Sequence, residues 1–68
     1  MPKQDIVKRI KELRAAMGLT QEQFAAAVGV TYATVNRWEN GNANPQPLAR
    51  KNLRVLAEQH GLKDVEDF

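Results

Sequence analysis

The sequence predicts an all-α fold, a compact bundle of four to five helices around a single core. Apolar residues recur at the three- and four-residue spacing of helices along most of the chain. Glycine or proline interrupts this pattern where one helix has to end and another begin. The 68 residues are enough for only one small core. We therefore expect one domain over residues 1–61, followed by an acidic C-terminal tail or short helical turn over residues 62–68.

The first helix is predicted over about residues 5–17. Its apolar residues follow a 4, 3, 4 spacing, with lysine and arginine between them: Ile6, Ile10, Leu13 and Met17. Gly18 ends the helix, because glycine tolerates the left-handed backbone with which many helices stop.

The second helix is predicted over about residues 21–28. Thr20 and Gln23 have the spacing of a capping box, in which two side chains satisfy free backbone amides at a helix start. The apolar face of this helix consists of Phe24, Ala25 and Val28. Gly29 then supplies the permissive backbone that a sharp turn needs.

The third helix is predicted to follow the polar cap Thr31 and to end near Asn40, at Gly41. Val35 and Trp38 lie three residues apart within it, so both side chains can face the same core.

The fourth helix is predicted to begin at Pro47, which suits a first helical turn because no backbone donor is needed there. It ends near His60 and Gly61. Its apolar residues are Leu48, Leu53, Leu56 and Ala57. Beyond it, an apolar residue recurs at every third position among acidic ones, a pattern typical of either one short helical turn or a frayed tail: Leu62, Val65 and Phe68.

The composition excludes several classes of function. The chain has no cysteine, so thiolate metal sites and disulfides are not available, and we expect no metal and no cofactor. It has no apolar run long enough to cross a bilayer and no secretory leader, so we expect a cytoplasmic protein without membrane contact. The chain has a single histidine and no pair of carboxylates expected to converge on a pocket. The sequence therefore indicates neither an enzyme nor a protein that binds a small-molecule ligand.

The net charge of +2 conceals an uneven distribution of charge. Residues 1–57 hold nine Lys or Arg and four Asp or Glu, a net charge of +5, whereas residues 58–68 carry −3. The basic residues of this part of the chain cluster within residues 3–14 and 50–54, and Arg37 is the one cation of the central pair. Attraction to phosphate would therefore come largely from the flanking helices.

The segment from Leu19 to Gly41 predicts two short helices joined by a tight glycine turn, which is the layout of a DNA-binding helix-turn-helix. It resembles the lambda-repressor-like family (Cro/C1-type, also called XRE) in four places: Thr20-Gln21, Phe24-Ala25, Gly29-Val30 and Trp38-Glu39-Asn40-Gly41. The resemblance covers about residues 5–60. It implies a sequence-specific DNA-binding transcriptional regulator. We expect a repressor that binds a palindromic operator in double-stranded DNA as a homodimer and inserts residues 31–40 into the major groove.

Base contacts are expected from the start of the third helix, at Tyr32, Ala33, Asn36 and Arg37. Arg37 can bridge O6 and N7 of guanine or simply contact a phosphate. Asn36 can pair with adenine or turn toward solvent. Tyr32 can pack on a thymine methyl group or on its own helix. Ala33 is small enough to approach a thymine methyl group, but it has no hydrogen-bonding group.

Contacts to the DNA backbone are expected from polar residues near helix ends and in the following loop: Gln21, Thr34, Asn40, Asn42 and Asn44. Gln21 begins the second helix, where free amides and the helix dipole favour a phosphate. Other members of the family often have lysine or arginine in the loop after Gly41, whereas this chain has neutral amides, which release no counterions. Four basic residues either contact phosphates in place of a basic loop or are merely solvated: Lys8, Arg9, Arg50 and Arg54.

Three residues are expected to be structural. The resemblance pairs Arg14 of the first helix with Glu39 at the end of the third, and the spacing predicts a buried indole at Trp38. A half-buried ion pair of this kind fixes geometry more than it adds stability.

Two questions stay open from the sequence. The dimer contact is expected among apolar residues that can equally well close the core: Leu56, Leu62, Val65 and Phe68. The alternative function is a protein-interaction module, such as a DNA-binding antitoxin or an adaptor, whose protein partner docks on the C-terminal tail.

Overall fold

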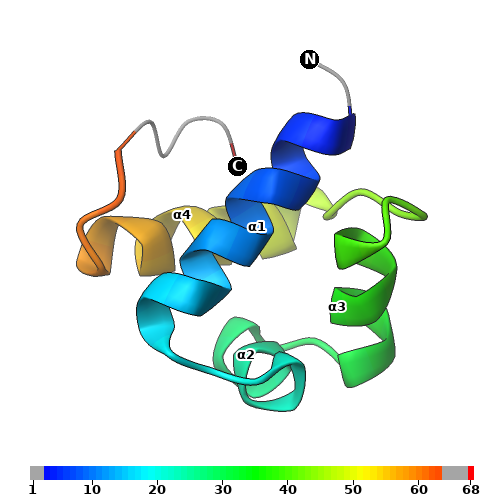
Figure 1. Ribbon diagram of the computed structural model, residues 1–68, viewed down its shortest axis with the longest axis horizontal. Helices are drawn as coiled ribbons and strands as arrows, with labels where there is room; N and C mark the ends of the chain where they lie inside the picture. The colour runs from blue at the N-terminus through cyan, green and yellow to red at the C-terminus, as the bar shows by residue number, and fades with distance from the viewer. Residues whose placement is uncertain (1–2, 64–67) are drawn as a thin grey trace.

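The computed structural model describes residues 3–63 and 68, and all regular structure within them is helical. The helices are α1 (Lys3–Met17), α2 (Gln21–Val28), α3 (Tyr32–Glu39) and α4 (Pro47–Gln59) (Figure 1). The predicted all-α fold is confirmed, and α2 has the bounds that its capping pattern predicted. α1 begins two residues earlier than expected. For residues 62–68 the sequence left a short helical turn or a frayed tail open; residues 62, 63 and 68 are not helical, and residues 64–67 lie outside the described part of the chain.

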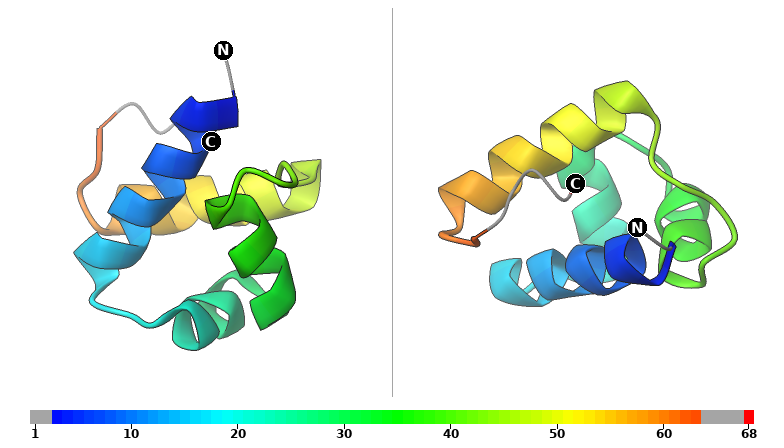
Figure 2. Two further views of the ribbon diagram at one scale, coloured as in Figure 1. Left: turned by 45° about the vertical axis from the view of Figure 1, so that its right-hand side comes forward. Right: turned by 90° about the horizontal axis from the view of Figure 1, so that it is seen from above.

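The helices α2 and α3 form the central pair of the fold. They pack against each other, while α1 packs on α3 and α4, and α2 also packs on α4. Figure 2 shows α1 and α4 on two sides of the domain, with α3 at one end of both. One side of α3 thus faces the core, and its other side remains open to solvent.

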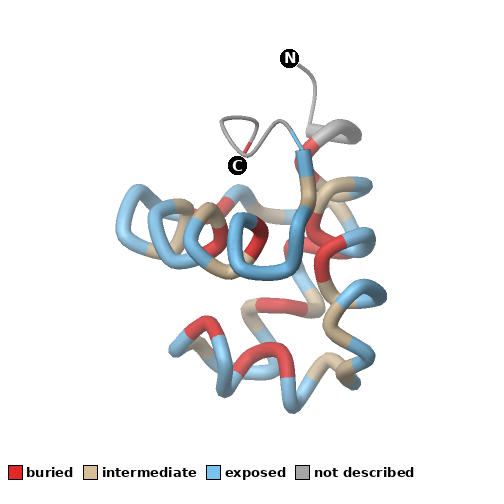
Figure 3. Tube along the Cα trace, turned by 90° about the vertical axis from the view of Figure 1, so that its left-hand side faces the viewer, coloured by how far each residue is buried: buried red, intermediate tan, exposed pale blue. Residues whose placement is uncertain are grey.

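The core draws at least one buried side chain from every helix (Figure 3). Its members are Ile6, Ile10 and Leu13 of α1, Phe24, Ala25 and Val28 of α2, Val35 and Trp38 of α3, Leu53 and Ala57 of α4, and Phe68. These are the apolar faces that helical spacing predicted for α2 and α3, and that predicted for α1 except Met17, which is only partly buried against the core.

Leu48 is the exception among the apolar residues predicted for the fourth helix. Its side chain is 72% exposed, whereas Leu53 and Ala57 are fully buried. At about 100° per residue, Leu48 lies 140° and 180° around the helix from those two residues. A helix of this length can turn only one face to the core, so Leu48 points to solvent.

The ends of the helices follow the predicted capping chemistry. The Thr20 hydroxyl accepts from the Gln23 amide at 3.1 Å, and the Gln23 side chain accepts from the Thr20 amide at 3.0 Å. Between α2 and α3, Gly29 adopts a φ of 92°, which L side chains rarely adopt. At the other side of this turn, the Thr31 hydroxyl accepts from the Thr34 amide at 3.2 Å and caps α3.

Phe68 closes the core between α1 and α4. Its side chain is only 2% exposed. Arg54 of α4 donates from Nη1 to the Phe68 carbonyl oxygen at 3.1 Å. Arg9 of α1 holds its guanidinium carbon 5.3 Å from the centre of the Phe68 ring. Of the two roles that the sequence left open for Phe68, these contacts favour core closure, and Leu56 and Leu62 are also packed against the core.

Candidate nucleic-acid interface

The outward face of α3 carries the residues predicted to contact bases. Tyr32 is 50% exposed, Ala33 and Arg37 are exposed, and Asn36 is half-buried. The opposite face of α3 is fixed by Val35 and Trp38, which are 0% and 3% exposed. The helix is therefore anchored through apolar side chains while its polar side stays accessible.

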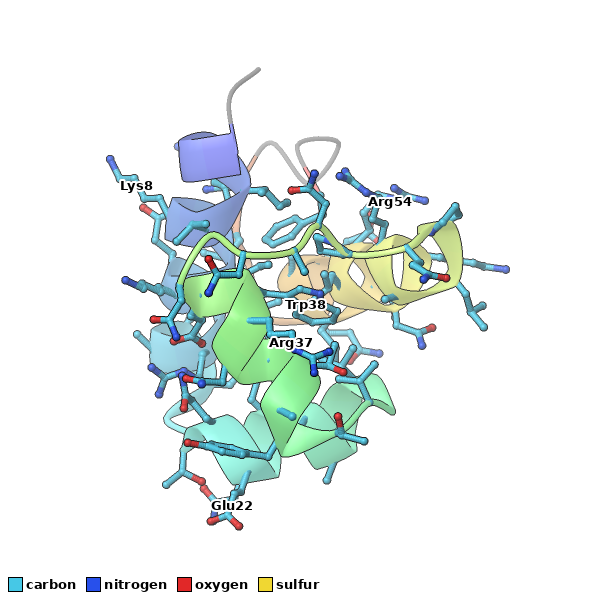
Figure 4. All side chains as sticks on the ribbon, turned by 90° about the vertical axis from the view of Figure 1, so that its right-hand side faces the viewer. Lys8, Glu22, Arg37, Trp38 and Arg54 are labelled. Atoms are coloured by element: carbon cyan, nitrogen blue, oxygen red, sulfur yellow. The ribbon has the colours of Figure 1, made fainter. Side chains whose placement is uncertain are left out.

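Arg37 extends from α3 toward the side nearest α4 (Figure 4). There it lines a groove of about 390 Å³ together with Asn44 and Leu48. Within residues 3–63 and 68, neither Arg37 nor Tyr32 forms a side-chain hydrogen bond or ion pair. Both side chains are therefore available to a ligand that approaches this face.

Three other predicted contact residues, Thr34, Asn36 and Asn40, are already bonded along α3. The Asn40 side chain donates to Asn36 Oδ1 at 3.3 Å, and the hydroxyl groups of Thr34 and Thr31 are 2.9 Å apart. The Asn36 oxygen is therefore turned along its own helix. Each of these groups keeps further hydrogen-bonding capacity for an external partner.

α3 ends in a tight, hydrogen-bonded turn that leads into the following loop. The Gly41 amide donates to the Trp38 carbonyl at 3.1 Å, and the Asn42 amide donates to the Arg37 carbonyl at 2.9 Å. These two bonds form a Schellman motif, which satisfies the last carbonyls of α3. Asn42 and Asn44 follow and are exposed, and Asn44 lines the groove beside Arg37.

Glu39 connects the three helices that support this surface. Its carboxylate accepts from Arg14 Nε at 2.7 Å and Arg14 Nη2 at 3.0 Å, and it also accepts from Gln21 Nε2 at 3.1 Å. The Glu39 side chain is 4% exposed and that of Arg14 is 28% exposed. Arg14 also donates to the Leu19 carbonyl at 3.1 Å. One carboxylate thus ties α1, α2 and α3 together.

The hydrogen bond from Arg14 to Glu39 raises the pKa of Arg14, burial acts in the opposite direction, and the charge of Glu39 adds to the increase. Arg14 is therefore held in its charged form, as a structural ion pair requires. Sequence analysis missed the bond between Gln21 and Glu39, because 18 residues separate them and no local pattern connects them.

Several of the basic residues have structural contacts. Arg9 forms an ion pair with Glu12 at 2.9 Å and also donates to the Lys63 carbonyl. Arg50 donates from Nε to the Pro45 carbonyl at 3.0 Å. With Arg54 bonded to Phe68, three of the four basic residues considered for phosphate contact stabilise the domain itself. Lys8, the fourth, is exposed.

The described residues contain no cluster of three or more His, Cys, Asp and Glu side chains that could hold a metal ion. Nor is any helix in this part of the chain both long and apolar enough to cross a membrane.

A family model described as helix-turn-helix matches residues 10–59, which include α2, α3, the turn between them and all of α4. The chain belongs to the Cro/C1-type helix-turn-helix family. This finding confirms the resemblance that the sequence of α2, the turn and α3 indicated.

This helix-turn-helix protein has relatives in archaea. One from Methanothermobacter thermautotrophicus is 42% identical over 60 residues, which cover 87% of this chain and 81% of the relative. Two from Archaeoglobus fulgidus are 48% and 47% identical over 49 residues, which cover 71% of this chain and 70% and 69% of the relatives. All three are named uncharacterized HTH-type transcriptional regulators. No solved structure matches the chain significantly.

Proposed function

We propose that this helix-turn-helix protein is a sequence-specific DNA-binding transcriptional repressor. In this proposal α3 enters the major groove of double-stranded DNA, and two copies bind the two halves of a palindromic operator. The protein has no catalytic role. Repression follows when the bound operator overlaps a promoter, because the bound protein then competes with RNA polymerase.

The observation that carries the proposal is the division of α3 into two faces. Val35 and Trp38 pack the helix against the core, while Tyr32, Ala33 and Arg37 are exposed and their side chains form no hydrogen bond or ion pair with other described residues. A helix mounted in this way fits the major groove, whose width matches the diameter of a helix. Arg37 is the proposed base contact, because its planar guanidinium can donate two hydrogen bonds to guanine.

Backbone contacts are proposed for the polar groups at the edges of this surface: Gln21, Thr34, Asn40, Asn42 and Asn44. Gln21 begins α2, so its backbone amide has no partner within the helix and can donate to a phosphate. Its side chain meanwhile remains bonded to Glu39 at 3.1 Å. These contacts would position the protein on DNA without specifying the sequence.

A dimer is proposed because one domain of this size can contact only a few base pairs. Two recognition helices about one helical turn of DNA apart would give the interface area that specific binding requires.

The test is selection of binding sites from a random pool of double-stranded DNA, followed by titration of the enriched sites. We expect an enriched motif with two related halves. The Arg37→Ala variant should lose its preference at one base pair of each half, a change of roughly 1–3 kcal/mol. Lys51→Ala is the matched control, since Lys51 is an exposed cation of α4. The proposal fails if the wild-type protein enriches no motif.

The second candidate, a protein-interaction module, is favoured by two exposed apolar side chains on α4. Leu48 is 72% exposed and Val55 is 46% exposed. They lie seven residues apart and therefore on one side of the helix. Cross-linking of the wild-type protein and a Leu48→Ser/Val55→Ser variant, with and without operator DNA, would distinguish a second copy of the chain from a different partner.

A further inference from the structure

A second groove, of about 550 Å³, lies between α1 and the end of α3. Lys8 and Lys11 line it from α1, and Asn40 and Gly41 line it from the end of α3. Asn40 is one of the residues proposed to contact the DNA backbone. The groove therefore joins two lysines of the first helix to the edge of the proposed DNA-binding surface.

The lysines are the uncompensated charges of this groove. Its two carboxylates are each paired with an arginine, Glu12 with Arg9 at 2.9 Å and Glu39 with Arg14 at 2.7 Å. Lys8 and Lys11 are exposed and have no ion pair within the described chain. They lie three residues apart, on the same side of α1. The groove consequently has a positive rim.

The position of this rim relative to α3 decides what it can bind. One flank of α3 borders the first groove, which Arg37 and Asn44 line, and the groove of Lys8 and Lys11 meets α3 at its C-terminal end, through Glu39. Figure 4 shows Lys8 on the side of α3 opposite to α4. A helix in the major groove has one sugar-phosphate strand on each side. Each flank of α3 would therefore face its own strand.

We propose that Lys8 and Lys11 bind the phosphates of the strand on the α1 side of α3. This inference rests on the proposed DNA-binding function and adds to it the source of the electrostatic affinity. The loop on the other flank has neutral amides, and Arg9, Arg50 and Arg54 are held by internal contacts. The two lysines supply the counterion release that the loop cannot supply.

The experiment measures DNA affinity as a function of salt for the wild-type protein, a Lys8→Gln/Lys11→Gln variant and the control Lys51→Gln. Lys51 is also an exposed lysine, but it belongs to α4 and lines neither groove. Each protein is titrated with the enriched operator and with a random-sequence duplex. Thermal melting of all three proteins checks that the fold is unchanged, as substitution of exposed side chains should leave it.

The expected result is a shallower salt dependence for the double variant. Each lost phosphate contact should reduce the slope of log affinity against log salt by about 0.9, so the slope should fall by about 1.8 for each bound protomer. Between about 50 and 200 mM salt, the affinity of the variant should therefore change about 12-fold less per bound protomer than that of the wild type. The reduction should be the same on both duplexes, and Lys51→Gln should keep the wild-type slope.

Three results would overturn the inference. An unchanged slope in the double variant, while the wild type binds DNA, would exclude the lysines as phosphate contacts and leave the proposed function intact. A reduction of the slope by Lys51→Gln of at least half that expected for the double variant would indicate a general effect of net charge, because this control removes one lysine instead of two. Absence of salt-dependent binding by the wild type would reject the proposed function together with the inference.

Discussion

Arg14 and Glu39 form a two-pronged ion pair between α1 and α3, with N–O distances of 2.7 Å and 3.0 Å. The Glu39 side chain is nearly inaccessible to solvent, so water cannot replace Arg14 as its partner without exposing buried surface, whereas the Arg14 side chain is 28% exposed. Removal of one partner from such a pair leaves a charge that the surroundings do not compensate.

The Glu39→Ala variant should consequently be less stable than the wild type. Loss of one partner of a buried pair costs about 3–5 kcal/mol, and the partial exposure of Arg14 reduces the expected loss to about 2–3 kcal/mol. Urea denaturation followed by circular dichroism measures this quantity. The exposed Glu58→Ala variant is the control and should be nearly neutral. Equal midpoints for the two variants would contradict the prediction.

The stabilising effect of the ion pair should not depend on pH in the neutral range. The bond to Glu39 raises the pKa of Arg14 in the folded state. A basic group whose pKa is raised on folding stabilises the protein fully below its pKa in the unfolded chain. This stabilisation is lost only as the pH rises through the pKa of the same group in the folded protein. For arginine this loss occurs in strongly alkaline solution.

The difference in unfolding free energy between the wild type and Arg14→Met should therefore be the same at about pH 7 and about pH 9. Urea denaturation at the two pH values provides the measurement. A difference that shrinks by more than about 1 kcal/mol over this interval would show that another group titrates with the pair.

Trp38 should contribute more to stability than any exposed aromatic residue. Its side chain is 3% exposed, and the Trp38→Ala variant should lose about 3–5 kcal/mol of unfolding free energy. The control Tyr32→Ala removes a ring that is 50% exposed on the same helix and should cost less than about 1 kcal/mol. Both values are measured by circular dichroism melts. Fluorescence is unsuitable, because Trp38 is the only tryptophan and the Trp38→Ala variant has no tryptophan signal. A similar loss in both variants would mean that Trp38 is not an anchor of α3.

Phe68 should stabilise the monomer rather than a dimer. The Phe68→Ala variant removes a ring that is 2% exposed and should lose about 3 kcal/mol of unfolding free energy. Phe68→Leu should recover part of this loss, because it refills much of the volume. Light scattering coupled to size exclusion should find the same mass for the wild type and both variants at equal concentration. A dimeric wild type with a well-folded monomeric Phe68→Ala variant would reverse the assignment.

The central part of the fold could be predicted from sequence because its determinants are local. The bounds of α2 and the turn after it depend on Thr20, Gln23 and Gly29, which act on backbone within a few residues of themselves. The pairing of Arg14 with Glu39, in contrast, was expected only from the family resemblance. Nothing in the spacing of two residues 25 positions apart predicts a contact.

The surface was predicted less well, because charge and hydrophobicity do not reveal the partner of a side chain. Arg54 is basic, yet it binds the carbonyl of Phe68, 14 residues away. Leu48 is apolar, yet it points to solvent because α4 turns another face to the core. The candidate DNA contacts of α3 stay predictions until DNA binding is measured.

The shared carboxylate of Glu39 has a consequence for the thermodynamics of binding. Since α1, α2 and α3 are joined before any DNA arrives, the protein surface needs little ordering on association. Binding should then proceed with nearly unchanged protein backbone and a small conformational entropy loss for the protein. The heat-capacity change of binding should accordingly reflect the area of the interface itself, without the large added contribution of a segment that folds on DNA.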